Sequence, residues 1–216
     1  MKIIDFSEKN SLINSFTAEM RDANIQKDPG RFRKNMQRLG EIMAYEISGT
    51  FEYRQEEVHT PFGVSKINLP AGNPVISTIL RAGIPFHYGF LSYFDHAENA
   101  FVSAYRKYKD ALKFDVNIEY ITSPRLDGKT LIITDPMLAT GVSMELAYKA
   151  LLTKGTPACI HVASIIASQQ AVEYVKTKFP ENTTFWFCAV DPDLSPEAYI
   201  MPGLGDAGDL AFGEKE

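Results

Sequence analysis

Short apolar runs alternate with helical patterns through residues 71–190, and this alternation limits the fold more than any other feature of the chain. The pattern predicts strands at 75–80, 100–105, 130–134, 160–167 and 185–190, and helices at 85–94, 143–154 and 169–179. Such an order predicts an α/β fold, with a mostly parallel, twisted sheet flanked by helices. In sheets of this kind, ligands bind beyond the carboxyl ends of the strands.

Two further segments precede this core. Residues 11–50 have a helical pattern, with apolar side chains recurring on one helix face at Phe32, Met36, Leu39, Met43 and Ile47. Turn residues between two strand-like arms predict a β-hairpin at 57–67. We interpret 1–216 as one domain, in which 1–70 form an N-terminal helical layer and a hairpin arm, 71–190 the α/β core and 191–216 a C-terminal hood. Within the core, Ser168 is the expected N-cap of a helix.

Composition and charge narrow the classes of function. The chain has 216 residues, of which 45% are hydrophobic and 23% charged, enough for one substantial core. A net charge of −5 argues against a general nucleic-acid surface, so no nucleic acid is expected as a partner. No leader or membrane span is visible, which predicts a cytoplasmic protein with no membrane partner. Cys159 and Cys188 lie in apolar runs and are expected to be buried free thiols, and the four histidines have no metal-ligand spacing.

The strand-like run at 130–134 ends at Asp135 and passes through a loop of small and hydroxyl residues into a helix. Several backbone N–H groups therefore point at one spot, which predicts a phosphate cradle. The Gly-Lys-Ser/Thr sequence of a nucleoside triphosphate site is missing from this loop. Asp135 can accept hydrogen bonds from sugar hydroxyls while 140–143 hold a phosphate. Taken alone, the segment is also compatible with an ordinary capped corner of an α/β protein.

Cationic side chains follow the two preceding strands. Arg81 lies in a tight turn with Gly83, and Arg106 stands beside Lys107 and Lys109. Because parallel strands end at the same edge of a sheet, we expect these cations near Asp135. Arginines at loop edges are more often exposed and unpaired, which is the alternative for each one singly.

The C-terminal segment 199–209 has too many glycines for a strand or helix and is too apolar for a disordered tail. It is typical of an ordered loop that presents its backbone. The amides of Gly205 and Ala207 are placed to bond a flat polar ring in its plane, and Asp206 could face a sugar or its metal-bound phosphate.

With these motifs the chain resembles the uracil phosphoribosyltransferase family, a branch of the type I phosphoribosyltransferases. The matching segments stand in the family's order and spacing: Thr-Ile-Leu-Arg-Ala-Gly at 78–83, Tyr-Arg at 105–106, Asp-Pro-Met-Leu-Ala-Thr-Gly at 135–141, and Tyr-Ile-x-Pro-Gly-Leu-Gly-Asp-Ala-Gly-Asp at 199–209. The last of these is highly specific to the uracil branch. Val142 and Lys107 depart from the family's pattern.

The resemblance implies transfer of the phosphoribosyl group of 5-phosphoribosyl 1-diphosphate (PRPP) to N1 of uracil, giving UMP and pyrophosphate. It implies that Arg81 and Arg106 bind the pyrophosphate group and that Arg81, Arg106, Asp135 and Asp206 are catalytic. The implied PRPP loop comprises Asp135, Pro136, Met137, Leu138, Ala139, Thr140, Gly141, Val142 and Ser143. The implied uracil contacts are Ile200, Gly205, Asp206 and Ala207, with Asp206 also touching PRPP. Mg²⁺ would arrive bound to PRPP rather than in a metal site of the protein.

Two partners and two alternative functions remain open. GTP activates some relatives, and a hairpin and a helical layer outside the core suggest a homodimer or higher homo-oligomer. The rival is a pyrimidine regulator on the same fold that senses PRPP or binds RNA, and the basic residues between Arg31 and Arg38 keep it open. A related transferase for another base is a third interpretation.

Overall fold

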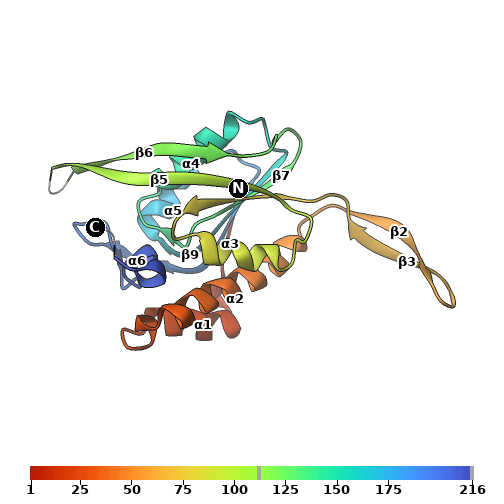
Figure 1. The fold of residues 1–216 in the computed structure, drawn as a ribbon, viewed down its shortest axis with the longest axis horizontal. Coiled ribbons are helices and arrows are strands. Elements are labelled where there is room, and N and C mark those ends of the chain that lie inside the picture. The colour runs from red at the N-terminus through yellow and green to blue at the C-terminus, as the bar shows by residue number, and fades with distance from the viewer. Residues whose placement is uncertain (111–112, 215–216) are drawn as a thin grey trace.

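The computed structural model describes residues 1–110 and 113–214, with side chains described outside 104–117. Its central sheet has the strand order β1-β10-β9-β7-β4-β5-β6, and β8 also pairs with β9 (Figure 1). All pairs are parallel except β5 with β6. The strands of this sheet are β1 Lys2–Asp5, β4 Val75–Leu80, β5 Glu98–Asp110, β6 Lys113–Thr122, β7 Thr130–Thr134, β8 Met137–Leu138, β9 Cys159–Ser168 and β10 Thr183–Asp191.

Helices cover both faces of the sheet, which confirms the predicted α/β class. Buried side chains alternate along the strands: Ile132 packs with the core on the side of α1, α2, α3 and α6, while Leu131 and Ile133 pack with the core on the side of α4 and α5. The helices are α1 Leu12–Arg21, α2 Pro29–Ser48, α3 Ile84–Leu91, α4 Val142–Leu152, α5 Gln169–Lys176 and α6 Ala207–Phe212, with short 3₁₀ turns η1 Phe6–Glu8 and η2 Ile25–Lys27.

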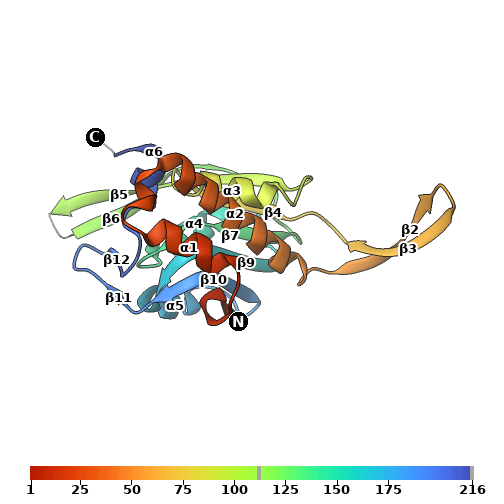
Figure 2. The ribbon, with the colours of Figure 1, turned by 90° about the horizontal axis from the view of Figure 1, so that it is seen from below.

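The predicted helical layer is present but divided. The first helix, α1, ends at Arg21, and Asp28 follows η2 and caps α2. Its carboxylate accepts from the amides of Gly30 at 2.9 Å and Arg31 at 3.1 Å while Pro29 occupies the first turn. The five apolar residues predicted for one face of this layer are all buried in the core. The N-terminal helices therefore close one face of the sheet (Figure 2).

The predicted hairpin is also present and is longer than expected. Its strands are β2 Tyr53–Thr60 and β3 Gly63–Pro70, which pair antiparallel and extend away from the body of the molecule (Figures 1 and 2). Phe62 at the turn is fully exposed. Neither core cluster of the described residues includes a residue of the arm. Packing within this chain therefore does not account for the apolar side chains on the arm.

Four expectations need correction. The strands β1, β6 and β8 were not predicted, and β5 runs past the expected end at residue 105 as far as Asp110. The C-terminal segment expected to be a loop contains the strand β12 Ile200–Met201, which pairs with β11 Asp193–Leu194, and the start of α6. Cys159 is half-buried rather than buried, whereas Cys188 is buried; burial raises the pKa of both thiols. Ser168 is the N-cap of α5 as predicted, since its hydroxyl accepts from the Ala171 amide at 2.9 Å. In the described residues, no helix combines the length and the hydrophobicity that crossing a membrane requires.

Candidate active site

The carboxyl ends of β4 and β7 lie side by side, as the sequence predicts. Thr78 pairs with Thr134 in the sheet register, so Arg81 and Asp135 follow adjacent strand ends. Two side-chain bonds reinforce this pair of strands: the Thr78 hydroxyl donates to Thr134 O at 3.3 Å, and the Thr134 hydroxyl donates to Ser77 O at 3.0 Å. The edge is therefore held by buried hydrogen bonds as well as by the ladder.

Arg106 does not follow a strand end. Leu80 pairs with Ser103 in the last register position of β4 with β5, and β5 then continues, with Arg106 opposite Val116 of β6. The two strands form a ribbon that runs beyond the edge of the sheet (Figure 1). The expected strand end was wrong because the antiparallel partner prolongs pairing after the parallel neighbour stops. The side chains of Arg106 and Lys107 lie outside the described residues.

The segment after Asp135 forms a tight loop against β9. Backbone bonds run from the Asp135 amide to Ala163 O at 3.1 Å and from the Ile166 amide to Pro136 O at 3.0 Å. The Ser168 hydroxyl donates to Ala139 O at 2.6 Å. The loop surrounds a cavity of about 30 Å³, and the residues that line it are Asp135, Met137, Leu138, Ala139, Thr140, Gly141, Ser143 and Met144. Of the expected PRPP loop, Pro136 and Val142 are not part of this lining.

Gly141 is the N-cap of α4, and its position requires a glycine. Its φ is +81°, and a Cβ there would lie 2.9 Å from Cδ1 of Tyr174 and 3.0 Å from Cγ1 of Val175. With no side chain at the cap position, the first-turn N–H groups of α4 face the loop, which is the geometry of an anion site. The Val142 amide is directed to the Thr140 hydroxyl at 3.4 Å.

Glu145 anchors α4 directly behind this loop. Its side chain is 9% exposed and lies 2.8 Å from Nζ of Lys149, and it accepts a hydrogen bond from the Tyr174 hydroxyl of α5. These bonds, that from Lys149 first, lower the pKa of the Glu145 carboxyl. Glu145 is therefore an ionised contact between the two helices that position Gly141.

The glycine-rich C-terminal segment folds back over the strand ends. Nη2 of Arg81 lies 2.8 Å from Oδ1 of Asp209 and 2.7 Å from Gly213 O. A Cβ at Gly208 would lie 3.7 Å from Cβ of Ala82, so the start of α6 packs against the turn after β4. Both ribbon views place α6 at the end of the molecule toward which β5 runs, opposite the arm. The tail and the expected phosphate loop, residues 135–143, therefore share one end of the molecule.

The expected base-binding residues take different positions in this tail. Asp206 is the N-cap of α6, and its Oδ1 accepts from the amides of Gly208 at 2.8 Å and Asp209 at 3.0 Å. Gly205 has a φ of +92°. As whole residues, Ile200 and Ala207 are 4% and 2% exposed and pack into the core, so neither presents its side chain to a ligand.

The sequence analysis missed Arg21, Asp191 and Asp209. Arg21 and Asp191 form an ion pair behind the tail, and Asp209 holds Arg81. Asp191 is the last residue of β10, so the strand-end argument that selected Asp135 could have found it. Arg21 carries no such local signal.

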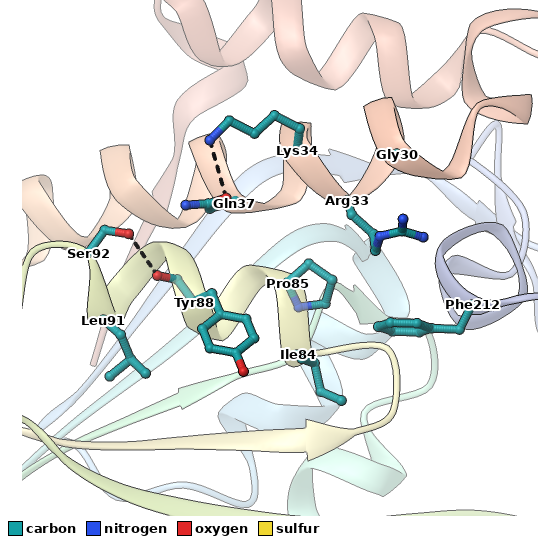
Figure 3. A pocket seen from close by; sticks show the side chains of 10 residues that line it. All are labelled: Gly30, Arg33, Lys34, Gln37, Ile84, Pro85, Tyr88, Leu91, Ser92 and Phe212. Carbon is teal, nitrogen blue, oxygen red and sulfur yellow. Dashed lines mark hydrogen bonds between the residues drawn. The ribbon is translucent and has the colours of Figure 1, made fainter.

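A second cavity, of about 760 Å³, lies between α2, α3 and the end of α6 (Figure 3). Nη1 of Arg33 donates to Ala211 O at 2.6 Å, and Figure 3 shows the Arg33 side chain extending towards Phe212. The cavity combines two cations with aromatic and aliphatic side chains, and its lining residues are Gly30, Arg33, Lys34, Gln37, Ile84, Pro85, Tyr88, Leu91, Ser92 and Phe212.

Comparisons with known proteins agree with this arrangement. The family profile described as Uracil phosphoribosyltransferase matches residues 7–214. A uracil phosphoribosyltransferase of Porphyromonas gingivalis is 60% identical over 215 residues, covering 100% of both chains. One of Methanothermobacter thermautotrophicus is 40% identical over 188 residues, covering 86% of this chain and 85% of the relative. The solved AQ2163 protein of Aquifex aeolicus superposes with a TM-score of 0.87 at 28% identity, over 98% of each chain.

The profile covers the helical layer, the strand-end edge and the glycine-rich tail together. The match to the Porphyromonas gingivalis protein extends over the whole chain. The chain therefore belongs to the uracil phosphoribosyltransferase family.

Proposed function

We propose that this protein transfers the phosphoribosyl group of PRPP to N1 of uracil, giving UMP and pyrophosphate in pyrimidine salvage. The observation that carries the proposal is the contact of the C-terminal tail with Arg81, because it brings a base-sized backbone surface to the edge that carries the phosphate loop. Membership of the family supports the choice of uracil.

PRPP would bind across the strand ends. The first-turn amides of α4 and the hydroxyls of Thr140 and Ser143 suit the 5-phosphate, and Asp135 can accept from the ribose hydroxyls. Arg81 suits the diphosphate: its Nε is buried and has no hydrogen-bond partner among the described residues, so the guanidinium has capacity for a further acceptor. Arg106 would be a second cation for the same group.

Uracil would lie against the tail, between Ile200 and Ala207. The amides of Gly205 and Ala207 can donate to uracil O4, whereas cytosine would present an amino group to the same donors. A buried mismatch of this kind can discriminate between bases by about 10⁴-fold. Asp206, one residue from both amides, would contact base and sugar together.

The reaction would be a displacement at the anomeric carbon. The bond from C1 to the diphosphate oxygen breaks as the bond to uracil N1 forms, through a transition state with oxocarbenium character, and the proton on N1 is released to solvent. The protein's task is to align the two substrates and to stabilise charge on the departing diphosphate through Arg81 and Arg106. This chemistry needs no covalent nucleophile.

The residues of the site fit a magnesium ion that is carried by PRPP. Asp135 and Asp206 supply hard oxygen donors, and the described part of the chain has no group of three or more His, Cys, Asp or Glu that could hold a metal. Asp135 and Asp206 would contact the ion or its waters. When bound, Mg²⁺ would neutralise negative charge on the diphosphate.

We further propose GTP as an effector, bound in the cavity of Figure 3. Arg33 and Lys34 suit a triphosphate, and the rings of Tyr88 and Phe212 suit a purine. Titrating GTP into the assay should raise the rate, and Lys34→Ala should shift the response to higher GTP concentration without changing the rate at zero GTP. A response that is identical in the variant would place GTP elsewhere.

We propose a homodimer or higher homo-oligomer built with the hairpin arm. The arm exposes five large apolar side chains although it contacts no core, and such surfaces commonly mark interfaces. They are Tyr53, Phe62, Val64, Ile67 and Leu69. A second copy of the chain is the proposed partner.

We also propose that the protein works in the cytoplasm. Cys159 and Cys188 are both unpaired, which is typical of a reducing compartment. The proposed substrate PRPP carries several phosphate charges and would be retained there.

The experiment that tests the proposed function is an assay with PRPP, Mg²⁺ and a panel of bases. We expect UMP and pyrophosphate in equal amounts from uracil, and little product from cytosine or purines. Product from another base, or no product together with a gel shift of pyrimidine-operon RNA, would contradict it in favour of the transferase or regulator alternatives.

A further inference from the structure

An ion pair lies behind the base-binding tail, formed by Arg21 at the end of α1 and Asp191 at the end of β10. Nη2 of Arg21 lies 2.7 Å from Oδ1 of Asp191, and Nη1 lies 2.8 Å from Oδ2. Both residues also bond the backbone of Gly203: Nη1 of Arg21 donates to Gly203 O at 3.0 Å, and the Gly203 amide donates to Oδ2 of Asp191 at 2.9 Å. Both backbone polar groups of this tail residue are therefore bound by the pair.

Low solvent exposure and bidentate geometry favour a rigid ion pair. The Asp191 side chain is 7% exposed and that of Arg21 is 23% exposed. A bidentate arginine–carboxylate contact with little exposure fixes the orientation of both groups, and removing one partner leaves a buried charge.

Gly203 is the bend that directs the tail towards the strand ends. Its φ is +56°, and a Cβ there would lie 1.9 Å from Ile200 O, so the chain turns sharply between Ile200 and Gly205. Gln26 supports the same region from the helical layer: its Nε2 donates to Arg21 O at 3.1 Å, and its Oε1 lies 4.0 Å from a Cβ built on Gly205. The orientation of the Gly205 amide therefore depends on the position of this bend.

We propose that Arg21 and Asp191 are positioning residues for uracil. They act through Gly203 to hold the amides of Gly205 and Ala207 at the angle that uracil O4 requires. This inference rests on the proposed function of the tail. A purely structural pair would stabilise the fold without favouring one substrate over the other.

The test is the kinetics of Arg21→Ala with each substrate varied in turn. We expect kcat/KM for uracil to fall by about 100-fold, as expected for a reacting group misplaced by about 1 Å, with weaker rejection of cytosine. The KM for PRPP should change less, by about 2-fold, because the side-chain hydrogen bonds given for the pair in the described residues go to Gly203 and not to Arg81 or to residues 135–143. Equal losses for uracil and PRPP, or unchanged discrimination between uracil and cytosine, would overturn the proposal.

The matched control is Arg31→Ala. Arg31 also makes a bidentate pair, with two distances of 2.7 Å to Glu19 on α1, so the variant removes a similar contact from the same helical layer without touching the tail. We expect its uracil kinetics to match the wild type. A similar uracil defect in this control would assign the effect to the helical layer in general and contradict the proposal.

Asp191→Asn is the second variant, and it carries the test if Arg21→Ala does not fold. It keeps an oxygen that can accept from the Gly203 amide, so a smaller uracil-selective loss is expected. The double variant should be no worse than Arg21→Ala, because both residues act through one bend. Full additivity of the two losses would contradict a shared action.

Hydrogen exchange separates this inference from the proposed function. In the substrate-free protein, Arg21→Ala should speed exchange at the amide of Gly203, which donates to Asp191, by at least about 10-fold, but leave the amides of residues 140–143 unchanged. Unchanged exchange at Gly203 would overturn the positioning role even if the wild type makes UMP. A wild type that makes no UMP, with faster exchange in the variant, would instead refute the proposed function of the tail.

Discussion

Arg81 is bound to the C-terminal helix in the substrate-free protein. Through this contact, Arg81 could link binding of PRPP at the strand ends to the position of the tail, where uracil is proposed to bind. Its guanidinium contacts Asp209 and Gly213, with the two charged side chains about one-third exposed. A pair so accessible to solvent contributes less than about 1 kcal/mol to stability. PRPP could therefore compete for the guanidinium without disrupting the fold, and the tail would respond to the diphosphate through the same residue.

The first prediction concerns Arg81→Ala. Loss of a group that stabilises the departing diphosphate should lower kcat by about 100-fold, or about 3 kcal/mol, while the free energy of unfolding changes by less than about 1 kcal/mol. Steady-state kinetics and urea denaturation measure the two quantities. Arg125→Ala is the control, since Arg125 is 86% exposed and precedes the amino end of β7, whereas Asp135 follows its carboxyl end. Unchanged turnover in Arg81→Ala would refute the role.

The second prediction concerns His161, which is buried in β9. Burial lowers the pKa of His161 to about 4, and its Nδ1 accepts from the Trp186 indole at 3.1 Å. In the unfolded chain, the His161 side chain has a pKa near 6.5. The contribution of neutral His161 to the free energy of unfolding is therefore fully present above that pH and is lost as the pH falls towards 4. Between pH 7 and pH 5 this loss amounts to about 2 kcal/mol.

His161→Gln removes the titrating group and isolates this effect. Urea denaturation of both proteins at pH 7 and pH 5 should show the wild type losing about 2 kcal/mol more than the variant. The Glu145 carboxyl, whose pKa is lowered, titrates below this window and so does not account for the difference. Parallel pH dependence in the two proteins would show that His161 is not the cause.

At the scale of elements, helices and strands whose own sequence carries a strong apolar pattern were predicted well, and the edge strands β1 and β6 were not. The strands predicted at 75–80 and 130–134 match β4 and β7 residue for residue, because these strands are buried on both faces and are rich in Val, Ile and Leu. The edge strand β1 has only four residues, two of them exposed, so its apolar signal is too short to detect. β6 alternates polar and apolar residues, which is itself a strand signal, so this strand could have been predicted from the sequence.

The candidate site also contains some parts that the sequence could predict and others that it could not. The phosphate loop and the tail are continuous motifs, so sequence alone could locate them. The contacts that bring them together join residues far apart in the chain: Arg81 to Asp209 spans 128 positions and Arg21 to Asp191 spans 170. No local periodicity reports on such pairs, which is why Arg21 and Asp209 were missed.

The third prediction tests the start of α4. Gly141→Ala should lower the free energy of unfolding by about 1 to 2 kcal/mol and raise the KM for PRPP, because a left-handed backbone is strained by a Cβ and the methyl group would meet Tyr174 and Val175. Gly72→Ala is the control, since a Cβ there has no neighbour within 4 Å. Wild-type stability and PRPP binding in the Gly141→Ala variant would show that the loop tolerates the side chain.

At the scale of the whole molecule, the arm and the proposed active site lie at opposite ends. An arm that pairs with a second copy would therefore leave the strand ends of its own chain open to substrate. The body is complete without the arm, because both core clusters are formed by residues outside 53–70. Assembly and catalysis can thus be tested separately.

The fourth prediction is that the arm controls the oligomeric state. The Ala71 amide donates to Glu52 O at 2.8 Å, so residues 53–70 can be replaced by a short glycine turn that joins adjacent backbone. Light scattering after gel filtration should give a monomer mass for the shortened chain and a multiple of it for the wild type. Equal oligomeric states would exclude the arm as the interface.

A crystal structure with bound UMP tests most directly the central claim, that the tail and the phosphate loop form one site. We expect the phosphate on the amides of residues 140–143 and uracil O4 within hydrogen-bond distance of the Gly205 or Ala207 amide. A nucleotide bound in the cavity between α2 and α3 alone, or a base directed away from the tail, would contradict the account.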